Sequence, residues 1–280
     1  MLALDLSPDG SVAVSGGQDG RVRFHDIASG AQLADDKGDG RNAWVEHVAF
    51  APDGSSVATA AGKTVRFWSP RGEFISEVTG LTSTVAAIAW AKAGSGYELL
   101  AACYGGVHKL APRLSAPTAS MLWKGSIISL SPSPDGKYVA AGTQESMVIV
   151  WTPIRPDPLK MEGYPRKSRE LAWSSDSLSL ATGGAASIVL WSFAGKGPQG
   201  TTGKQLGSHG DVISSLVMLR RDGTMLSGAR NGMLAAWTSA STKPLFTLSL
   251  SGAVEIIQLS ADEKSFATAA ENGELTVWDF

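Results

Sequence analysis

The chain has 280 residues, with 32 Gly, 13 Pro, 8% aromatic and 18% charged residues, a composition that suits a folded, turn-rich β-protein better than a helical or disordered one. Its 24 Lys and Arg against 26 Asp and Glu give a formal net charge of −2. Since no dense basic run appears, neither nucleic acid nor an anionic membrane is expected as a partner.

Nothing in the sequence predicts a secretory signal or a membrane span. Asp5 and Asp9 interrupt the apolar N-terminal stretch, unlike the apolar core of a signal peptide. No run approaches the ~18 apolar residues of a transmembrane helix. The single cysteine, Cys103, excludes an internal disulfide framework and favours a reducing compartment. We therefore expect a cytoplasmic protein.

A short turn motif recurs along the chain. It is S-P-D-G at 7–10, and its counterparts follow at intervals of roughly forty residues, a period typical of repeat architectures. The interval between Asp53 and Asp135 is double, and the sequence A-K-A-G at 91–94 marks the hidden unit within it. The motif aspartates are Asp9, Asp53, Asp135, Asp176, Asp222 and Asp262.

A second landmark lies 15 or 16 residues after each of these aspartates, at the end of a β-branched run. Most units place tryptophan there, and we expect these large side chains to fill the space between neighbouring sheets. The residues at this position are His25, Trp68, Trp151, Trp191, Trp237 and Trp278, and Leu110 fills it in the hidden unit.

Each unit predicts the same order of strands. An alternating segment, such as 45–51 or 85–91, is expected to form the inner strand, followed by the D-G turn. A run of small apolar residues, such as 57–61 or 225–229, predicts a middle strand that lets sheets approach closely. A second Gly turn then leads to the strand that ends at the tryptophan position, and a weaker fourth strand precedes the next unit.

Seven such units account for the whole chain, so we predict one domain, 1–280. A four-stranded sheet cannot bury both its faces alone, and β units of this length stack radially as propeller blades. The predicted units are 1–42, 43–81, 82–122, 123–164, 165–207, 208–250 and 251–280.

These residues resemble the WD40 repeat family in the S-P-D-G turn, the small-residue middle strand, the x-D-G turn and the terminal Trp278–Asp279 pair. The resemblance implies an all-β, seven-bladed β-propeller that acts as a non-catalytic scaffold for protein–protein interactions. It also implies that an N-terminal strand completes the last blade, and the sequence has no segment for this. We therefore expect a three-stranded last blade and a weak join between the first and last blades.

The family also implies a buried hydrogen-bond network around the tryptophan. His209 with Ser227 and Trp237 matches it, although Asn231 replaces the family's Asp, and Tyr164 occupies the His position one unit earlier. Other units lack the full set, so their stability is expected to rest on apolar packing. The remaining residues assigned a structural role are Trp68, Trp151, Trp191 and Trp278.

We expect no metal, cofactor or catalytic site. His25, His47, His108 and His209 stand in different units, without the spacing of metal ligands. The acidic segment 34–46 resembles a calcium loop at some positions, but Lys37 stands where an oxygen ligand is required. The Gly-rich segment 194–206 likewise lacks the P-loop pattern.

Partner binding is expected at the loops that precede the inner strands and at the second Gly turns, which the family uses for recognition. The partners would be other proteins, and the chain would be a monomer or a subunit of a complex. An alternative is a small-molecule-binding or hydrolase-like propeller with a site in the central channel. The partner-binding candidates are Trp44, Lys167, Gln18, Glu145, Arg230 and Glu271.

The segment 152–170 departs from the repeat pattern, with prolines that suit an edge strand or an extended connection. An outer strand with its loop is the simpler interpretation. The basic residues Arg166, Lys167 and Arg169 at its end could also meet an acidic partner.

Overall fold

The computed structural model describes residues 1–36 and 43–280, and it places these in 25 β-strands without a helix. The all-β prediction is therefore confirmed for the described part of the chain. Asp39 and Gly40 of the acidic segment considered for calcium lie outside the described residues. Two compact units make up the chain, Met1–Ile128 and Ser129–Phe280.

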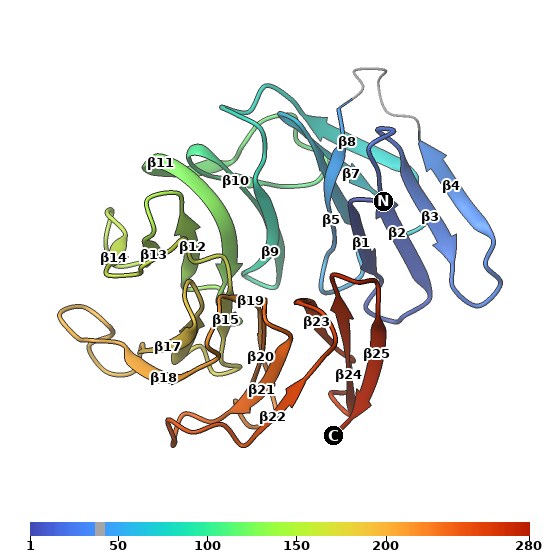
Figure 1. Ribbon diagram of the computed structural model, residues 1–280. Helices are drawn as coiled ribbons and strands as arrows, with labels where there is room; N and C mark the ends of the chain where they lie inside the picture. Colours follow the sequence, from blue (N-terminus) through green and yellow to red (C-terminus); the bar gives the residue numbers. More distant parts are fainter. Residues whose placement is uncertain (37–42) are drawn as a thin grey trace. The chain divides into compact units, whose positions relative to one another are not determined.

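Unit 1 begins with two four-stranded antiparallel sheets in which the strands lie side by side in chain order (Figure 1). In β2 the side chains alternate between buried and less buried positions, as the period-two pattern predicts. The first sheet contains β1 (Ala3–Leu6), β2 (Val12–Gly16), β3 (Val22–Asp26) and β4 (Gln32–Asp36). The second contains β5 (Val45–Phe50), β6 (Val57–Ala61), β7 (Thr64–Trp68) and β8 (Phe74–Val78).

The predicted seven blades are wrong, because the described residues form six sheets. The third sheet has six strands in the order β14-β13-β12-β11-β10-β9, and it takes in the predicted units 82–122 and 123–164. Its strands are β9 (Ala87–Ala93), β10 (Gly96–Leu110), β11 (Ala119–Pro132), β12 (Val139–Thr143), β13 (Val148–Trp151) and β14 (Leu159–Met161).

Uninterrupted strands explain this merger. The boundary expected between residues 122 and 123 falls inside β11, which has no proline before its last residue and only one glycine, so nothing ends the strand there. In β10 the chain continues through Gly105 and Gly106, where the pairing with β11 shifts register between Tyr104 and Gly106 instead of breaking. The fold is thus of β-propeller type with six blades.

Unit 2 contains three further antiparallel sheets, each again in chain order (Figure 1). The last sheet has three strands, whereas the other two have four. The first has β15 (Leu171–Trp173), β16 (Ser179–Thr182), β17 (Ser187–Ser192) and β18 (Lys204–Ser208). The second has β19 (Ile213–Met218), β20 (Met225–Ala229), β21 (Met233–Trp237) and β22 (Phe246–Ser249). The third has β23 (Val254–Leu259), β24 (Ser265–Ala270) and β25 (Leu275–Asp279).

Small residues in the middle strands allow neighbouring sheets to approach closely. A Cβ atom on Gly16 in β2 would collide with Val45 at the start of β5, and one on Gly228 in β20 would collide with Val254 in β23. Each glycine thus removes the atom that would push the next sheet away. The valines it admits are themselves buried core residues.

The repeated aspartates hold the turns between inner and middle strands. The carboxylate of Asp9 accepts hydrogen bonds from the hydroxyl of Ser7 at 2.6 Å and from the backbone N–H of Ser11 at 3.0 Å. The same pair of bonds recurs at Asp135, where Ser133 and Lys137 are the donors. These aspartates therefore stabilise the turns by accepting hydrogen bonds from residues two positions before and after them.

Candidate functional site

The family-type network lies in the sheet of β19 to β22. The hydroxyl of Ser227 accepts the indole N–H of Trp237 at 2.7 Å and lies 2.8 Å from Nε2 of His209. Asn231, in place of the expected Asp, donates its side-chain N–H to the carbonyl of His209. Burial lowers the pKa of His209, which favours the neutral imidazole that such a network requires.

Tyr164 takes the position of the histidine one sheet earlier. Its hydroxyl accepts the indole N–H of Trp191 at 2.7 Å and lies 2.7 Å from the hydroxyl of Thr182. The phenol therefore links strand β16 to strand β17, whereas in the following sheet Trp237 of β21 donates directly to Ser227 of β20. These side chains connect neighbouring strands by buried hydrogen bonds, and this geometry is that of a structural network.

The predicted partner-binding residues lie on the surface at turns and at the starts of inner strands. Trp44, directly before β5, is 51% exposed, so it is not enclosed by the neighbouring strands. The others are exposed too: Gln18 between β2 and β3, Glu145 between β12 and β13, Lys167 before β15, Arg230 between β20 and β21, and Glu271 between β24 and β25.

A recurring backbone hydrogen bond joins the start of an inner strand to a second Gly turn. The N–H of Val45 donates to the carbonyl of Gly17 at 3.0 Å, which places Trp44 next to the turn of Gln18. In unit 2, the N–H of Ile213 makes the equivalent bond to the carbonyl of Ala185 at 3.0 Å, and within one sheet the N–H of Arg230 donates to the carbonyl of Val212 at 3.0 Å. The second turn of one sheet therefore lies beside the start of an inner strand.

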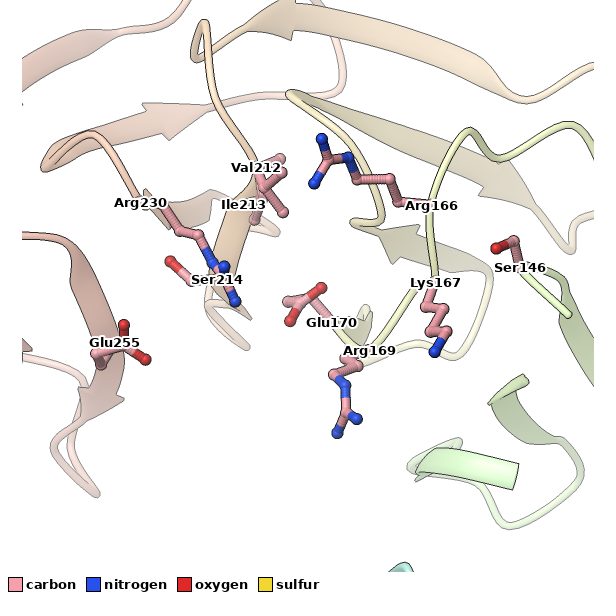
Figure 2. Close-up of a pocket in the computed structure, with 10 residues that line it drawn as sticks. All are labelled: Ser146, Arg166, Lys167, Arg169, Glu170, Val212, Ile213, Ser214, Arg230 and Glu255. Atoms are coloured by element: carbon pink, nitrogen blue, oxygen red, sulfur yellow. The ribbon is translucent and has the colours of Figure 1, made fainter. Parts of the chain in front are cut away.

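This arrangement forms a pocket of about 550 Å³ in unit 2. Lys167 and Arg230, two of the predicted residues, both line it, whereas Gln18 and Trp44 belong to unit 1. Glu145 and Glu271 do not line it, although Ser146, next to Glu145, does. The charged residues of the lining are Arg166, Lys167, Arg169, Arg230, Glu170 and Glu255. In the view of Figure 2, the side chain of Glu170 lies between Arg230 on one side and Lys167 on the other.

Ser168 anchors the segment that carries three of these cations. It is completely buried, its hydroxyl donates to the carbonyl of Gly183, and its own carbonyl accepts a hydrogen bond from Ser129 at 3.3 Å. Because successive side chains of an extended segment point to opposite sides, the burial of Ser168 directs Lys167 and Arg169 outward. Both are exposed in the structure.

The four cationic side chains of the pocket form no ion pair within the described residues. Among residues 1–36 and 43–280, no side-chain hydrogen bond or ion pair engages Arg166, Lys167, Arg169 or Arg230. In contrast, Arg220 in the same unit forms an ion pair of 2.9 Å with the buried carboxylate of Glu263. The pocket therefore presents free positive charge to a ligand.

Glu170 forms the inner, negatively charged part of the pocket. Burial raises the pKa of its carboxyl group, opposed by backbone N–H groups and by the charges of Arg169 and Arg230. The Glu170 side chain lies against Gly183, where an added Cβ would be 3.1 Å from a carboxylate oxygen of Glu170. Burial without a salt bridge leaves this carboxylate able to accept a hydrogen bond from a ligand.

The polar side chains that line the pocket are six charged residues and two serines. Among the described residues that line the pocket there is no histidine or cysteine, and the hydroxyl of Ser214 donates to the carbonyl of Val254. No group of three His, Cys, Asp or Glu residues that could hold a metal occurs in the described part of the chain. A helix able to cross a membrane is likewise not found among these residues.

Sequence reasoning missed Glu170 and Glu255 as pocket residues. Glu170 lies directly before β15, and Glu255 is the second residue of β23. Both are near the starts of inner strands, where binding is expected, but neither occupies the one position per repeat that the family resemblance indicates. Their side chains reach the pocket because β15 and β23 start near the same turns. Comparing the three residues on either side of each aligned position would have found them.

Comparisons with known proteins agree with this arrangement. The WD40 family, described as "WD domain, G-beta repeat", matches residues 1–26, 36–69 and 118–152. WD repeat-containing protein 1 of Bos taurus is 27% identical over 157 residues, which cover 52% of this chain and 25% of that protein. Apoptotic protease-activating factor 1 of Rattus norvegicus is 23% identical over 283 residues, covering 99% of this chain and 22% of that protein. The chain thus spans about a quarter of the length of these relatives.

A solved structure shares the fold. A chain in the "Crystal Structure of Mitotic Checkpoint Complex" superposes with a TM-score of 0.80 at 20% sequence identity, covering all of this chain and 87% of the other. At this level of identity the likeness establishes the fold alone. Family matches in three separate regions, together with a relative that is named as a WD repeat-containing protein, show that these regions of the chain are similar to the WD40 repeat.

Proposed function

We propose that this protein is a non-catalytic scaffold that binds other proteins through the surface formed by its second turns and the starts of its inner strands. The observation that carries the proposal is the convergence of Lys167 and Arg230 with two further unpaired arginines on one pocket. Exposed Trp44, beside the turn of Gln18, extends the same kind of surface in unit 1. Aromatic and arginine side chains are the residues that most often anchor protein interfaces.

The known proteins support the same class of function. Three regions of the chain match the WD40 repeat, one relative is named as a WD repeat-containing protein, and the structure that shares the fold is described as a complex. We propose a cytoplasmic location as well, supported by the single cysteine, Cys103, which is a buried free thiol.

A small-molecule site is the second candidate, since a volume of about 550 Å³ lies within the range of ligand pockets. The composition of the lining argues against it. Small-molecule pockets are mostly apolar and aromatic with few polar groups, whereas six of the lining residues here carry charge and none is aromatic. The scaffold is therefore the better supported function.

The test is affinity capture from a lysate of the cells that produce the protein, with wild type and three variants. The pocket variant is Lys167→Ser with Arg230→Ser, and the second is Trp44→Ala. The control, Lys196→Ser with Lys243→Ser, removes the same charge from exposed positions outside the pocket. We expect specific proteins to be captured by wild type and control and lost with the pocket variant. Capture of no protein by wild type would overturn the proposal.

A further inference from the structure

We infer that the pocket in unit 2 binds an acidic side chain of an extended peptide segment, with a carboxylate or a phosphate as the recognised group. This inference rests on the proposed function and assigns its ligand chemistry. The pocket is lined by four cations and two acids, so its lining carries a formal charge of about +2, opposite in sign to the −2 of the whole chain. Positive charge is thus concentrated at this pocket.

The donors have the chemistry that oxyanions require. Three of the four cations are arginines, and a guanidinium can donate two parallel hydrogen bonds to a carboxylate or phosphate. Arg166 and Arg169 come from the segment before β15, whereas Arg230 comes from the turn after β20. Donors from two separate segments can therefore surround one oxyanion.

The four cationic side chains can bind a ligand without first breaking a hydrogen bond or an ion pair within the protein. Within the described ranges, all four lack a side-chain hydrogen bond or ion pair. A ligand oxyanion would therefore gain charge-assisted hydrogen bonds without breaking bonds of the protein. Anchoring by buried Ser168 also limits the freedom of Lys167 and Arg169, which lowers the entropic cost of holding the ligand.

Glu170 distinguishes a peptide from a simple anion. Its carboxylate, set among these cations (Figure 2), repels an oxyanion that approaches the inner part of the pocket and attracts a hydrogen-bond donor. An acidic peptide supplies both groups, because its side-chain oxyanion can bind the exposed cations while a backbone N–H donates to Glu170. A fully ionised anion such as sulfate has no hydrogen-bond donor for the second contact.

A nucleic acid fits these charges less well. Its backbone carries negative charge continuously, while the pocket offers four cations interrupted by Glu170 and bounded by Glu255. Each of these carboxylates would oppose a neighbouring phosphate. A peptide with a few acidic side chains separated by neutral residues matches the spacing of charges better.

The experiment measures binding of fluorescein-labelled peptides to the full chain by fluorescence anisotropy at low salt. The probes are a Gly-Glu repeat peptide of ten residues, the same peptide with phosphoserine in place of glutamate, and the same peptide with glutamine. We expect at least one of the anionic peptides to bind about tenfold or more tightly than the glutamine peptide. The two anionic probes distinguish carboxylate from phosphate as the preferred group, and a single-stranded DNA ten-mer tests the nucleic-acid alternative.

Variants assign the binding to the pocket. Arg169→Gln with Arg230→Gln should weaken binding of the tighter peptide about tenfold, while Arg230→Lys should give a smaller loss because it retains charge but not the planar donor pair. Lys196→Gln with Lys243→Gln is the matched control. Equal affinity for charged and glutamine peptides, equal loss in pocket and control variants, or tighter binding of DNA would each overturn the inference.

Failure here is distinguishable from failure of the scaffold proposal. If wild type captures specific proteins that depend on Lys167 and Arg230, but binds none of the anionic peptides more tightly than the glutamine peptide, the protein is a scaffold with a different ligand chemistry. If it captures no proteins, the proposed function itself is wrong. Circular dichroism of each variant shows whether its fold is retained.

Discussion

Ala141 occupies, beside Trp151, the position that a hydroxyl residue holds beside the tryptophan of four other sheets. In those sheets the residue two places after the partner of the tryptophan carries a hydroxyl that accepts the indole N–H, directly or through a tyrosine. The pairs are Thr59–Trp68, Thr182–Trp191, Ser227–Trp237 and Thr268–Trp278. Trp68, Trp237 and Trp278 donate directly to that hydroxyl, and Trp191 reaches Thr182 through Tyr164. Trp151 pairs with Val139, which places Ala141 in the same position. Within the described residues its buried indole N–H has no hydrogen-bond partner.

Supplying that hydroxyl should stabilise the protein. Ala141→Ser adds one oxygen on the face that carries Trp151, and a net hydrogen bond contributes about 1 kcal/mol. We expect the urea midpoint of unfolding to rise accordingly. Ala140→Ser is the matched control, since Ala140 is equally buried but faces the other side, where an unsatisfied hydroxyl should cost about 1–3 kcal/mol. Equal destabilisation by both substitutions would contradict the hydrogen-bond argument.

Removing an existing hydroxyl should have the opposite effect. Ser227→Ala leaves the indole N–H of Trp237 and Nε2 of His209 without their shared partner, and an unsatisfied buried group costs about 1–3 kcal/mol. Urea unfolding of Ser227→Ala and of Ser115→Ala, an exposed serine outside this network, makes the comparison. If both variants unfold at the wild-type midpoint, the network does not stabilise the sheet.

The turn aspartates should make the fold sensitive to strong acid. Hydrogen bonds, first from the Ser7 hydroxyl and then from Ser11, lower the pKa of Asp9 from 3.8 to about 2. A carboxyl group with a lowered folded-state pKa stabilises the fold above its unfolded pKa, and this contribution is lost as the pH falls through the folded value. The pKa is lowered in the same direction at Asp53, Asp135, Asp176, Asp222 and Asp262.

The free energy of unfolding should therefore decrease as the pH falls from about 4 toward 2, because these six turns lose their ionised acceptors. Urea titrations at several pH values measure the slope, and Asp9→Asn, which keeps an acceptor but not the charge, should reduce it. A slope unchanged between the wild type and Asp9→Asn would show that this turn does not contribute.

The carboxyl group of Glu170 should change the free energy of unfolding with pH in the direction opposite to the turn aspartates. Burial raises the pKa of its carboxyl group, so the folded state favours the protonated form. This contribution to stability is present below the unfolded pKa and is lost as the pH rises through the higher folded value. Glu170→Gln should therefore unfold at a higher urea concentration than wild type at pH 7, with the difference shrinking in acid. A variant less stable than wild type at pH 7 would mean that the neighbouring arginines outweigh the cost of burial.

The sequence by itself determined the local units of this protein. Turn formation depends on residues within a few positions of Asp9 or Asp135, and those hydrogen bonds appear where the S-P-D-G motif places them. Period-two alternation, glycines and the tryptophan positions likewise specify local strands and close sheet contacts, as Gly16 and Gly228 illustrate. Such features are visible in sequence because both partners lie in one repeat or at one aligned position in the next.

Only the tertiary structure decided how the strands join into sheets and which surface residues meet. Whether β11 ends at the expected boundary depends on hydrogen bonds with β10 and β12, which no single segment specifies, and so six sheets formed where the repeats predicted seven. Lys167 and Arg230 lie 63 positions apart in the chain. Glu170 lines the same pocket, two residues after Ser168, which is buried and bonded to Gly183. Residues distant in sequence meet at this pocket because neighbouring sheets pack together. The contacts that stabilise this packing join residues far apart in the chain, so no single segment predicts them.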